Sequence, residues 1–245
     1  MKRVVVVTGG GKGIGREIAL GVSKRGDTSI IVDKDYSMAK ETEHLIKESG
    51  FLANSYCADL TKPEEVASVF KEIFRDCGKI DVLINNAGYY CPKAMEELTI
   101  DFWDFVIDTN LKIAFLCSLE VFKYMKTANY GKIVNLSSAL AFTSGTELSP
   151  YITAKAGIIG LTRALAMDMG PYNITVNAVA PGLTPTESAL EVFRPERFEQ
   201  AKSLRAIKRD ETVGDLAGAI LFLIDASSDF MTGQTLVVDG GRVFT

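Results

Sequence analysis

Histidine and cysteine are both scarce in this 245-residue chain, which has one histidine and four cysteines. The lone histidine, His44, excludes a multi-histidine metal site, and a Ser-His-Asp triad would have to recruit it from a polar segment that we expect at the surface. The cysteines form no C-x-x-C pair and lie far apart, at Cys57, Cys77, Cys91 and Cys117. We therefore expect no metal site and no disulfide framework, with thiols that are reduced and mostly buried.

Long apolar runs and clusters of like charge are also missing. The longest purely apolar run, at 219–224, is far shorter than the roughly 18 residues needed to cross a bilayer. The run of valines at 4–7 is too short for the core of a signal peptide. The 27 lysines and arginines nearly balance the 31 aspartates and glutamates, which gives a net charge of −4. We expect a cytoplasmic protein that binds neither nucleic acid nor membrane.

What the chain does contain is a regular alternation of apolar strands and helical segments. Strands are expected at 4–7, 29–32, 53–57, 82–85, 132–136, 174–179 and 235–238, and helices at 16–25, 37–49, 63–77, 101–127, 150–170 and 212–223. A capping box at 61–64 is expected to open the third helix. Apolar strands that alternate with helices predict an α/β fold, a Rossmann-type doubly wound sheet of seven parallel strands with helices on both faces. No linker or shift in composition divides the chain, so residues 1–245 are expected to form a single domain.

A glycine-rich turn follows the first expected strand and precedes the first expected helix. It does not fit G-x-G-x-x-G, because Arg16 stands where the third glycine would fall, and it is not a P-loop, because Gly13 follows Lys12. It does fit T-G-x-x-x-G-x-G, whose glycines let the backbone approach a pyrophosphate held by amides at the start of the helix. The candidate cofactor-binding residues in this turn are Thr8, Gly9, Lys12, Gly13, Ile14 and Gly15.

Polar residues at the ends of the next strands extend the candidate cofactor site. The second strand ends in Asp33, whose carboxylate could accept both ribose hydroxyls of an adenosine and would repel a 2′-phosphate. That favours NAD over NADP, although Lys12 or Lys34 could neutralise a phosphate. The third strand is followed by Asp59 and Leu60, placed to meet the adenine edge. The fourth is followed by Asn85, Asn86, Ala87 and Gly88, where the cofactor would pass.

A tyrosine and a lysine four residues apart, Tyr151 and Lys155, are the candidates for chemistry. Ser149 is a favourable N-cap and Pro150 a favourable first residue, so a helix is expected to begin here and place both side chains on one face. A neighbouring cation favours the phenolate, but the lysine alone would lower the tyrosine pKa only modestly without a second cation such as an oxidised nicotinamide. Ser138, after the fifth strand, could hold a substrate oxygen against the phenol. Tyr-x-x-x-Lys also arises by chance as a surface pair, so the pattern depends on the rest of the chain.

Together these motifs resemble the short-chain dehydrogenase/reductase family. The ordered set that carries the resemblance is Thr8-Gly9-x-x-x-Gly13-x-Gly15, Asp59, Asn85-Asn86-Ala87-Gly88, Asn110, Ser138, Tyr151-x-x-x-Lys155, Pro181-Gly182 and Val238-Asp239-Gly240-Gly241. The resemblance covers the whole chain and implies an NAD(P)-dependent oxidoreductase that transfers a hydride between nicotinamide C4 and the carbon of a secondary alcohol or ketone. Similar family members include secondary-alcohol dehydrogenases and 3-oxoacyl-carrier-protein reductases, which usually use NADPH, and Asp33 argues against the latter. The alternative from another class is a non-catalytic dinucleotide sensor, which would normally have lost one of Ser138, Tyr151 and Lys155.

The resemblance also implies a role for each matching residue. Tyr151 would be the general acid/base, Ser138 would orient and polarise the substrate carbonyl, and Lys155 would hold the nicotinamide ribose and lower the pKa of the tyrosine. Asn110 would position a water that links Lys155 to solvent. The nicotinamide itself would be flanked by Pro181, Gly182 and Thr186, with Thr184 as a possible substitute for Thr186.

The sequence indicates the substrate less clearly than the cofactor. Apolar and aromatic residues follow several expected strand ends, at Tyr89, Tyr90, Cys91, Leu140, Phe142 and Leu183. If they line a pocket, they suit a hydrophobic or ring-bearing secondary alcohol or ketone, but they also fit as ordinary core and rim residues. The irregular stretch at about 183–211 is expected to be a substrate lid with short helices rather than a solvated insertion. The helices from 101 and 150 resemble those that pair between subunits in the family, which implies a homotetramer or homodimer, although burial within a monomer explains the same residues.

Overall fold

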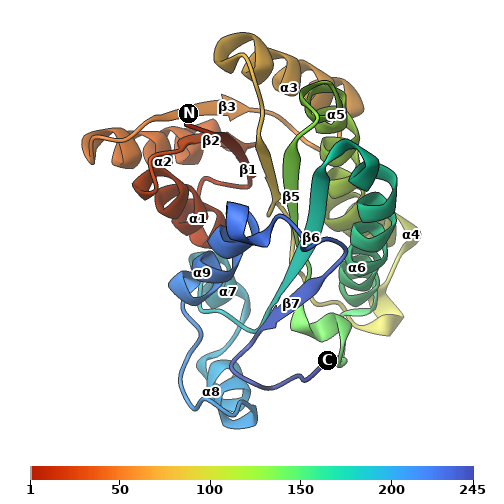
Figure 1. Ribbon diagram of the computed structural model, residues 1–245. Coiled ribbons are helices and arrows are strands. Elements are labelled where there is room, and N and C mark those ends of the chain that lie inside the picture. The colour runs from red at the N-terminus through yellow and green to blue at the C-terminus, as the bar shows by residue number, and fades with distance from the viewer. Residues whose placement is uncertain (1) are drawn as a thin grey trace.

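Seven short strands form one parallel sheet in the computed structural model, which describes residues 2–245 (Figure 1). Their spatial order is β3-β2-β1-β4-β5-β6-β7. The strands are β1 (Val4–Thr8), β2 (Thr28–Asp33), β3 (Ala53–Cys57), β4 (Val82–Asn85), β5 (Gly131–Leu136), β6 (Ile174–Pro181) and β7 (Thr235–Val238). The order reverses direction between β1 and β4, and ligands of open parallel sheets bind in the crevice at such a switch point.

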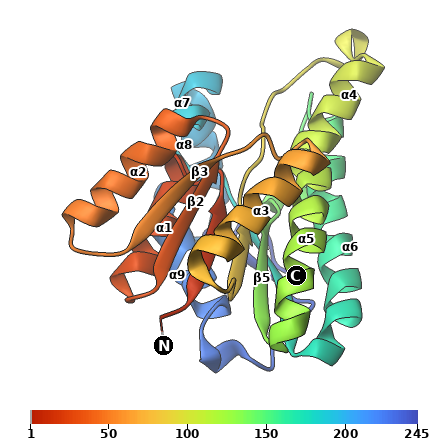
Figure 2. The same ribbon diagram turned by 90° about the horizontal axis from the view of Figure 1, so that it is seen from above.

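The helices cover the sheet in two layers, as Figure 2 shows. They are α1 (Gly13–Lys24), α2 (Tyr36–Glu48), α3 (Pro63–Cys77), α4 (Ile100–Ile107), α5 (Ile113–Ala128), α6 (Ser149–Met169), α7 (Glu187–Val192), α8 (Pro195–Leu204) and α9 (Val213–Leu223). Alternate residues of β1 serve the two layers, because successive side chains of a strand point to opposite faces. Val5 and Val7 pack with α1, α2 and α9, whereas Val4 and Val6 pack with α3, α5 and α6. The predicted fold class is confirmed, a single Rossmann-like domain with helices on both faces.

The long helix expected at 101–127 is interrupted by a π-helical turn, Asp108–Lys112, between α4 and α5. Two side chains at this turn donate hydrogen bonds to backbone carbonyls that would otherwise accept only from the backbone amides of an α-helix. Thr109 Oγ1 donates to Phe105 O at 2.7 Å, and Asn110 Nδ2 donates to Val106 O at 3.0 Å. Competition of this kind widens a helical turn. The expectation of one unbroken helix was therefore wrong at the turn that carries Asn110.

Two expected helix caps differ from the structure, and α1 begins at Gly13 rather than at Arg16. Ser149 is the first helical residue of α6 rather than its N-cap, a position taken by Leu148 without a side-chain hydrogen bond. At α3 the N-cap is Lys62, which makes no side-chain cap, and Thr61 lies before the helix with its Oγ1 donating to Asp59 Oδ1 at 2.7 Å. A true capping box occurs at α9, between Thr212 and Asp215.

The cysteines are less buried than expected. Cys117 is buried, Cys77 and Cys91 are half-buried, and Cys57 is exposed. His44 lies at the surface of α2 as predicted, with Nε2 3.0 Å from Glu48 Oε1. Within residues 2–245, no three histidine, cysteine or carboxylate side chains lie close enough to share a metal ion. No helix in that range is both long and apolar enough to cross a membrane.

Candidate active site

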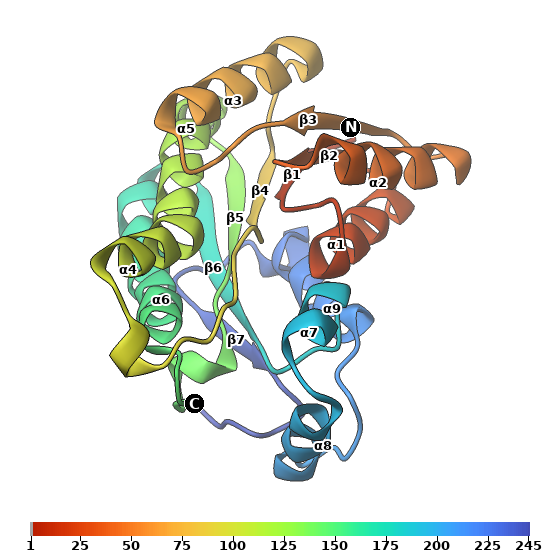
Figure 3. The same cartoon turned by 180° about the vertical axis from the view of Figure 1, so that it is seen from behind.

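A cavity of about 1140 Å³ opens along the carboxyl ends of the strands. It runs from β2 and β3 across the switch point to β6, and the segment that holds α7 and α8 lies at the same edge of the sheet, next to α9 (Figure 3). Of the candidate catalytic and cofactor-binding residues, every one except Thr8 and Asn85 lines this cavity. Parallel strands that all end at one edge explain how residues so far apart in sequence meet.

The glycine-rich turn is shaped so that side chains are excluded from it. Gly9 has a φ of +63°, and a Cβ there would lie 2.9 Å from Ala87 Cα. A Cβ on Gly15 would lie 2.1 Å from Gly9 O, so only glycine fits. The amino end of α1 has no side-chain cap, since its N-cap is Lys12. Free amide groups at the start of a helix and a backbone without side chains fit a pyrophosphate.

Thr8 lies beneath this turn and not in the cavity. Its Oγ1 accepts hydrogen bonds from the backbone N–H groups of Asn86 and Ala87, both at 3.1 Å. Asn86 Nδ2 donates in return to the carbonyls of Thr8 and Gly9, both at 3.0 Å. Thr8 therefore joins the end of β1 to the end of β4 and holds the cavity wall in place.

Two carboxylates line the part of the cavity near β2 and β3. Asp33 Oδ2 accepts a hydrogen bond from Gly11 N at 3.0 Å, which directs the carboxylate toward the glycine-rich turn. Gly11 was not singled out from the sequence, and a Cβ there would come within 2.9 Å of that oxygen. Asp59 Oδ1 accepts two hydrogen bonds from Thr61, which hold the pKa of the Asp59 carboxyl below its ordinary value. Leu60 lines the cavity beside Asp59.

Tyr151 and Lys155 lie on one face of α6 and project into the middle of the cavity with Ser138. Lys155 is 5% exposed, and its Nζ donates to Leu136 O at 2.9 Å. The same Nζ lies 5.7 Å from the centre of the Tyr151 ring. Ser138 is buried at the end of β5, where its Oγ accepts from Leu140 N at 3.2 Å. The three side chains share one cleft, and the chance surface pairing of Tyr151 and Lys155 is ruled out by the burial of the lysine.

Burial shifts the pKa values of these groups in a direction that the spacing alone did not indicate. Desolvation raises the pKa of the Tyr151 phenol to about 12, and hydrogen bonding with Ser138 opposes that rise. Desolvation also lowers the pKa of the Lys155 amine to about 8. The amine binds a carbonyl and lies too far from the phenolic ring to overcome the desolvation of the phenol. In the chain alone the Tyr151 phenol is therefore protonated at neutral pH. Lowering the pKa of this phenol would require further positive charge in the cavity.

Asn110 reaches the cavity from the π-helical turn. It is 2% exposed, accepts from Tyr89 N at 3.1 Å and donates to Tyr89 O at 2.9 Å. Gly88 lies between it and Lys155, because a Cβ there would be 2.9 Å from Asn110 Oδ1 and 3.3 Å from Lys155 Nζ. This glycine keeps a narrow space open between the amide and the amine, as a water-positioning role would need.

The two threonines after β6 face different neighbours. Thr186 caps α7, where its Oγ1 accepts from Ala189 N at 3.3 Å, and its Cβ would lie 3.5 Å from a Cβ on Gly13. Thr184 is buried, and its hydroxyl donates to Glu211 Oε1 at 3.1 Å. Both line the cavity with Pro181 and Gly182, but Thr186 is the one placed against the glycine-rich turn.

Glu211, at the end of the segment 183–211, contacts residues near both ends of that segment. Its Oε2 lies 3.4 Å from Arg205 Nη2, and that same nitrogen donates to Leu183 O at 2.6 Å. Both charged side chains are almost completely buried. Burial raises the pKa of the Glu211 carboxyl to about 7, against the opposing effects of Thr184 and Arg205.

Aromatic side chains lead outward from Tyr151 toward α8. The rings of Tyr90 and Tyr151 are 4.8 Å apart, and Tyr90 and Phe193 are also 4.8 Å apart. Most of the apolar residues expected at the substrate side line the cavity, namely Tyr89, Tyr90, Cys91, Leu140 and Leu183. Phe142 does not line it.

Sequence reasoning missed several residues at this end of the cavity. Thr109, Gln200 and Arg242 all line it. Arg242 carried a signal that could have been used, because it follows the last strand and so lies at the edge where the other strands end. Gln200 carried no such signal, since its position depends on how α8 packs.

Proteins similar to this chain are named as reductases and dehydrogenases, which supports an oxidoreductase activity for it. A family model described as "Enoyl-(Acyl carrier protein) reductase" matches residues 9–242. The (2S)-[(R)-hydroxy(phenyl)methyl]succinyl-CoA dehydrogenase subunit BbsD of Thauera aromatica is 37% identical over 241 residues, which cover 98% of this chain and 96% of that protein. The 3-oxoacyl-[acyl-carrier-protein] reductase FabG of Aquifex aeolicus is 33% identical over 98% of this chain and 96% of its own length. A crystal structure of an actinorhodin polyketide ketoreductase variant with NADPH has a TM-score of 0.93 and 30% identity, and covers 98% of this chain and 97% of that one.

Proposed function

The chain belongs to the short-chain dehydrogenase/reductase family of oxidoreductases that act on CH–OH groups, and from that premise we propose that it interconverts a hydrophobic or ring-bearing secondary alcohol and its ketone with an NAD(P) cofactor. The observation that carries the proposal is the meeting of Tyr151, Ser138 and Lys155 in one cavity with the glycine-rich turn. A sensor that only bound dinucleotide would have no need of the Tyr151 phenol and the Ser138 hydroxyl beside the Lys155 amine.

The cofactor would be held along the carboxyl ends of β1, β2, β3 and β4. The amides at the start of α1 would bind the pyrophosphate, Asp33 the adenosine ribose, and Asp59 with Leu60 the adenine edge. Lys155 would bind the nicotinamide ribose, and Thr186 with Pro181 and Gly182 would flank the nicotinamide. When bound, the nicotinamide supplies or accepts the hydride.

The residues of the chain would handle the proton and the substrate oxygen. The hydroxyl of Ser138 would donate a hydrogen bond to the substrate oxygen and hold it against the phenol of Tyr151. In ketone reduction, Tyr151 gives its proton to that oxygen as the alcohol forms, and in oxidation it takes a proton from the alcohol. The amine of Lys155, charged below about pH 8, would stabilise the resulting phenolate. Asn110 would position a water that links Lys155 to solvent.

We further propose NAD as the preferred cofactor and an assembly of two or four copies. The preference is supported by the carboxylate of Asp33, directed by Gly11 toward the expected ribose position, while Lys12 and Lys34 line the same region and oppose it. The assembly is supported by exposed apolar side chains on the outer face of α5, where Phe115 is 43% and Leu119 48% exposed. Residues 183–211 would cover the substrate as a lid.

A second candidate is reduction of a 3-oxoacyl group on a carrier protein with NADPH. It is favoured by the similarity to the FabG of Aquifex aeolicus. Asp33 disfavours it, because a carboxylate at the ribose repels the 2′-phosphate of NADPH.

The proposal is tested with the variant Tyr151→Phe, which removes the phenolic proton and keeps the ring. Wild-type protein is screened against secondary alcohols and ketones with NAD(H) and NADP(H) by following the absorbance of the reduced cofactor. We expect the variant to lose turnover by a factor of about 100 or more while its binding of NADH, followed by fluorescence, changes little. Tyr172→Phe, outside the cavity, is the matched control. Undiminished turnover in Tyr151→Phe would contradict the assignment.

A further inference from the structure

One positive charge in the lid points into the cavity without a carboxylate partner. Arg197 on α8 is half-buried and lines the cavity, and its guanidinium donates one hydrogen bond, from Nη1 to Gln200 Oε1 at 3.0 Å. No carboxylate oxygen in the described chain, residues 2–245, lies within 4.0 Å of it. By contrast, Arg205 pairs with Glu211 and Arg209 with Asp215. The guanidinium of Arg197 therefore keeps most of its hydrogen-bond donors available to a ligand.

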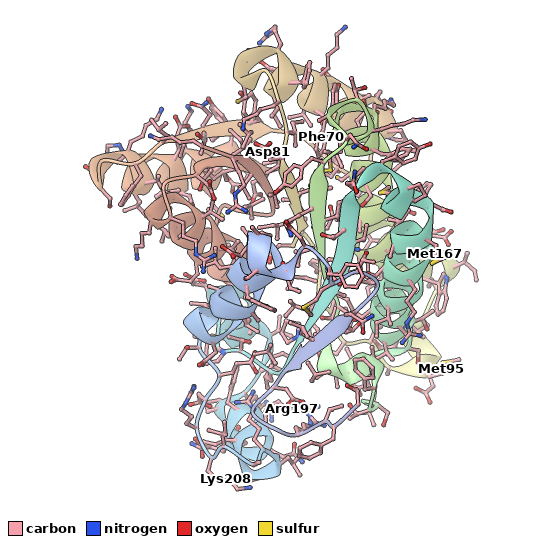
Figure 4. The ribbon with its side chains drawn as sticks, viewed as in Figure 1. Phe70, Asp81, Met95, Met167, Arg197 and Lys208 are labelled. Carbon is pink, nitrogen blue, oxygen red and sulfur yellow. The ribbon has the colours of Figure 1, made fainter. Side chains whose placement is uncertain are left out.

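Arg197 lines the same cavity as the aromatic side chains that lead outward from Tyr151. Tyr90 contacts the Tyr151 ring on one side and the Phe193 ring on the other, and Arg197 follows Phe193 by four residues. Burial raises the pKa of the Tyr90 phenol, and the positive charge of Arg197 opposes that rise. Figure 4 shows Arg197 between α8 and the sheet, whereas Lys208 lies at the outer edge of the same segment.

The charges around this end of the cavity favour an anionic ligand. A second arginine, Arg242, lines the cavity from beyond β7. The single acidic side chain that the described residues of the lid contribute to the cavity wall is Glu191, which is exposed to solvent. A planar guanidinium binds a carboxylate or phosphate through two parallel hydrogen bonds, which are stronger than those between neutral groups.

We propose that the substrate carries an anionic oxygen group, a carboxylate or a phosphate, which Arg197 binds at the lid end of the cavity while the apolar part of the substrate lies along Tyr90 and Phe193. This inference rests on the proposed function, since it places the reacting carbon at Tyr151. It makes Arg197 a residue that determines specificity and takes no part in proton or hydride transfer.

Three matched substrates distinguish the source of the negative charge. They are an aryl-substituted hydroxy acid, its methyl ester and its coenzyme A thioester, which present a carboxylate, no charge and phosphates, respectively. Each is assayed with wild-type protein and with Arg197→Gln and Arg197→Lys. The matched control is Arg194→Gln, which removes an exposed arginine at the start of the same helix, outside the cavity.

We expect Arg197→Gln to lower kcat/KM for the anionic substrate by about tenfold or more, mainly through KM, because a charge-assisted hydrogen bond is lost. Turnover of the methyl ester should stay within about twofold of the wild type, a smaller change than one neutral hydrogen bond would cause. Arg197→Lys should recover part of the loss, and Arg194→Gln should cause none. Loss confined to the hydroxy acid identifies a carboxylate, and loss confined to the thioester identifies a phosphate.

The inference is overturned if the methyl ester is turned over as efficiently as both anionic substrates, or if Arg197→Gln lowers all three equally. A binding measurement keeps this outcome separate from failure of the proposed function. The rise in unfolding temperature caused by 3-phenylpropanoate is compared with that caused by its methyl ester, without turnover. A larger rise with the acid than with the ester, lost in Arg197→Gln, supports the anion site even if no alcohol is oxidised. If the acid and the ester raise the unfolding temperature equally, and phenyl phosphate raises it no more than they do, the anion site is refuted.

Discussion

Replacing Asp33 with asparagine should change the choice of cofactor, because it removes one negative charge and keeps the shape of the side chain. The asparagine oxygen can still accept the hydrogen bond that Gly11 N donates at 3.0 Å. Two unit charges about 4 Å apart repel by about 1 kcal/mol in water and about 4 kcal/mol near a protein surface. Asp33 is half-buried in an open cavity, so the repulsion of a 2′-phosphate falls between these limits. The ratio of kcat/KM for NAD over NADP should therefore fall by about fivefold to a thousandfold.

The assay is the same alcohol oxidised with NAD and with NADP by wild type and variant at low salt. Glu41→Gln is the control, since Glu41 pairs with Arg16 on the outside of the cavity and its loss should leave the ratio unchanged. Salt screens exposed charges, so the gain in NADP use should shrink at high ionic strength. If Asp33→Asn keeps the wild-type ratio, the carboxylate does not face the adenosine ribose and the argument for NAD fails.

Three other properties can be tested in the same way. Gly15→Ala should destabilise the fold by about 2 kcal/mol or more, because its Cβ would lie 2.1 Å from Gly9 O, whereas Gly218→Ala on α9 should not, and equal stability of the two variants in urea would contradict this. The pKa of Lys155 is lowered to about 8 by burial, so the unfolded chain binds more protons than the folded one above pH 8. The free energy of unfolding should thus rise by about 2 to 3 kcal/mol between pH 8 and 10 relative to Lys155→Met, and identical pH profiles would refute the shift. Leu119→Glu, on the exposed face of α5, should reduce the mass measured by light scattering, and an unchanged mass would argue against an interface there.

Much of the fold could be predicted because its elements repeat one pattern. The buried valines of β1, the glycine-rich turn and the strand that ends at Asp33 each signal a parallel sheet with helices between the strands. The candidate site followed from the same pattern, because the carboxyl ends of parallel strands meet at one edge. Residues as distant as Asp33 and Ser138 could therefore be assigned to one edge of the sheet from the sequence, whereas Thr186 followed only from the family resemblance.

What could not be predicted depends on contacts between distant segments. The π-helical turn arises where Thr109 and Asn110 bond to backbone carbonyls, which helix periodicity does not reveal. Thr61 donates to Asp59 Oδ1 from both its N–H and its hydroxyl, and α3 begins after Lys62, which the capping-box pattern did not reveal. The pKa of Tyr151 moved upward because desolvation outweighed its hydrogen bond with Ser138, and the spacing of residues along a helix does not indicate their burial.

The buried ion pair of Arg205 and Glu211 has a consequence for how this chain can diverge. The pair, with Leu183 and Thr184, holds both ends of the segment that contains α7 and α8. The residues between these ends can then be exchanged for others, because the exchange leaves intact the ion pair and the hydrogen bonds that attach the segment. A chimera that takes residues 187–204 from a relative should acquire a different substrate range while the dinucleotide half of the protein stays as it was.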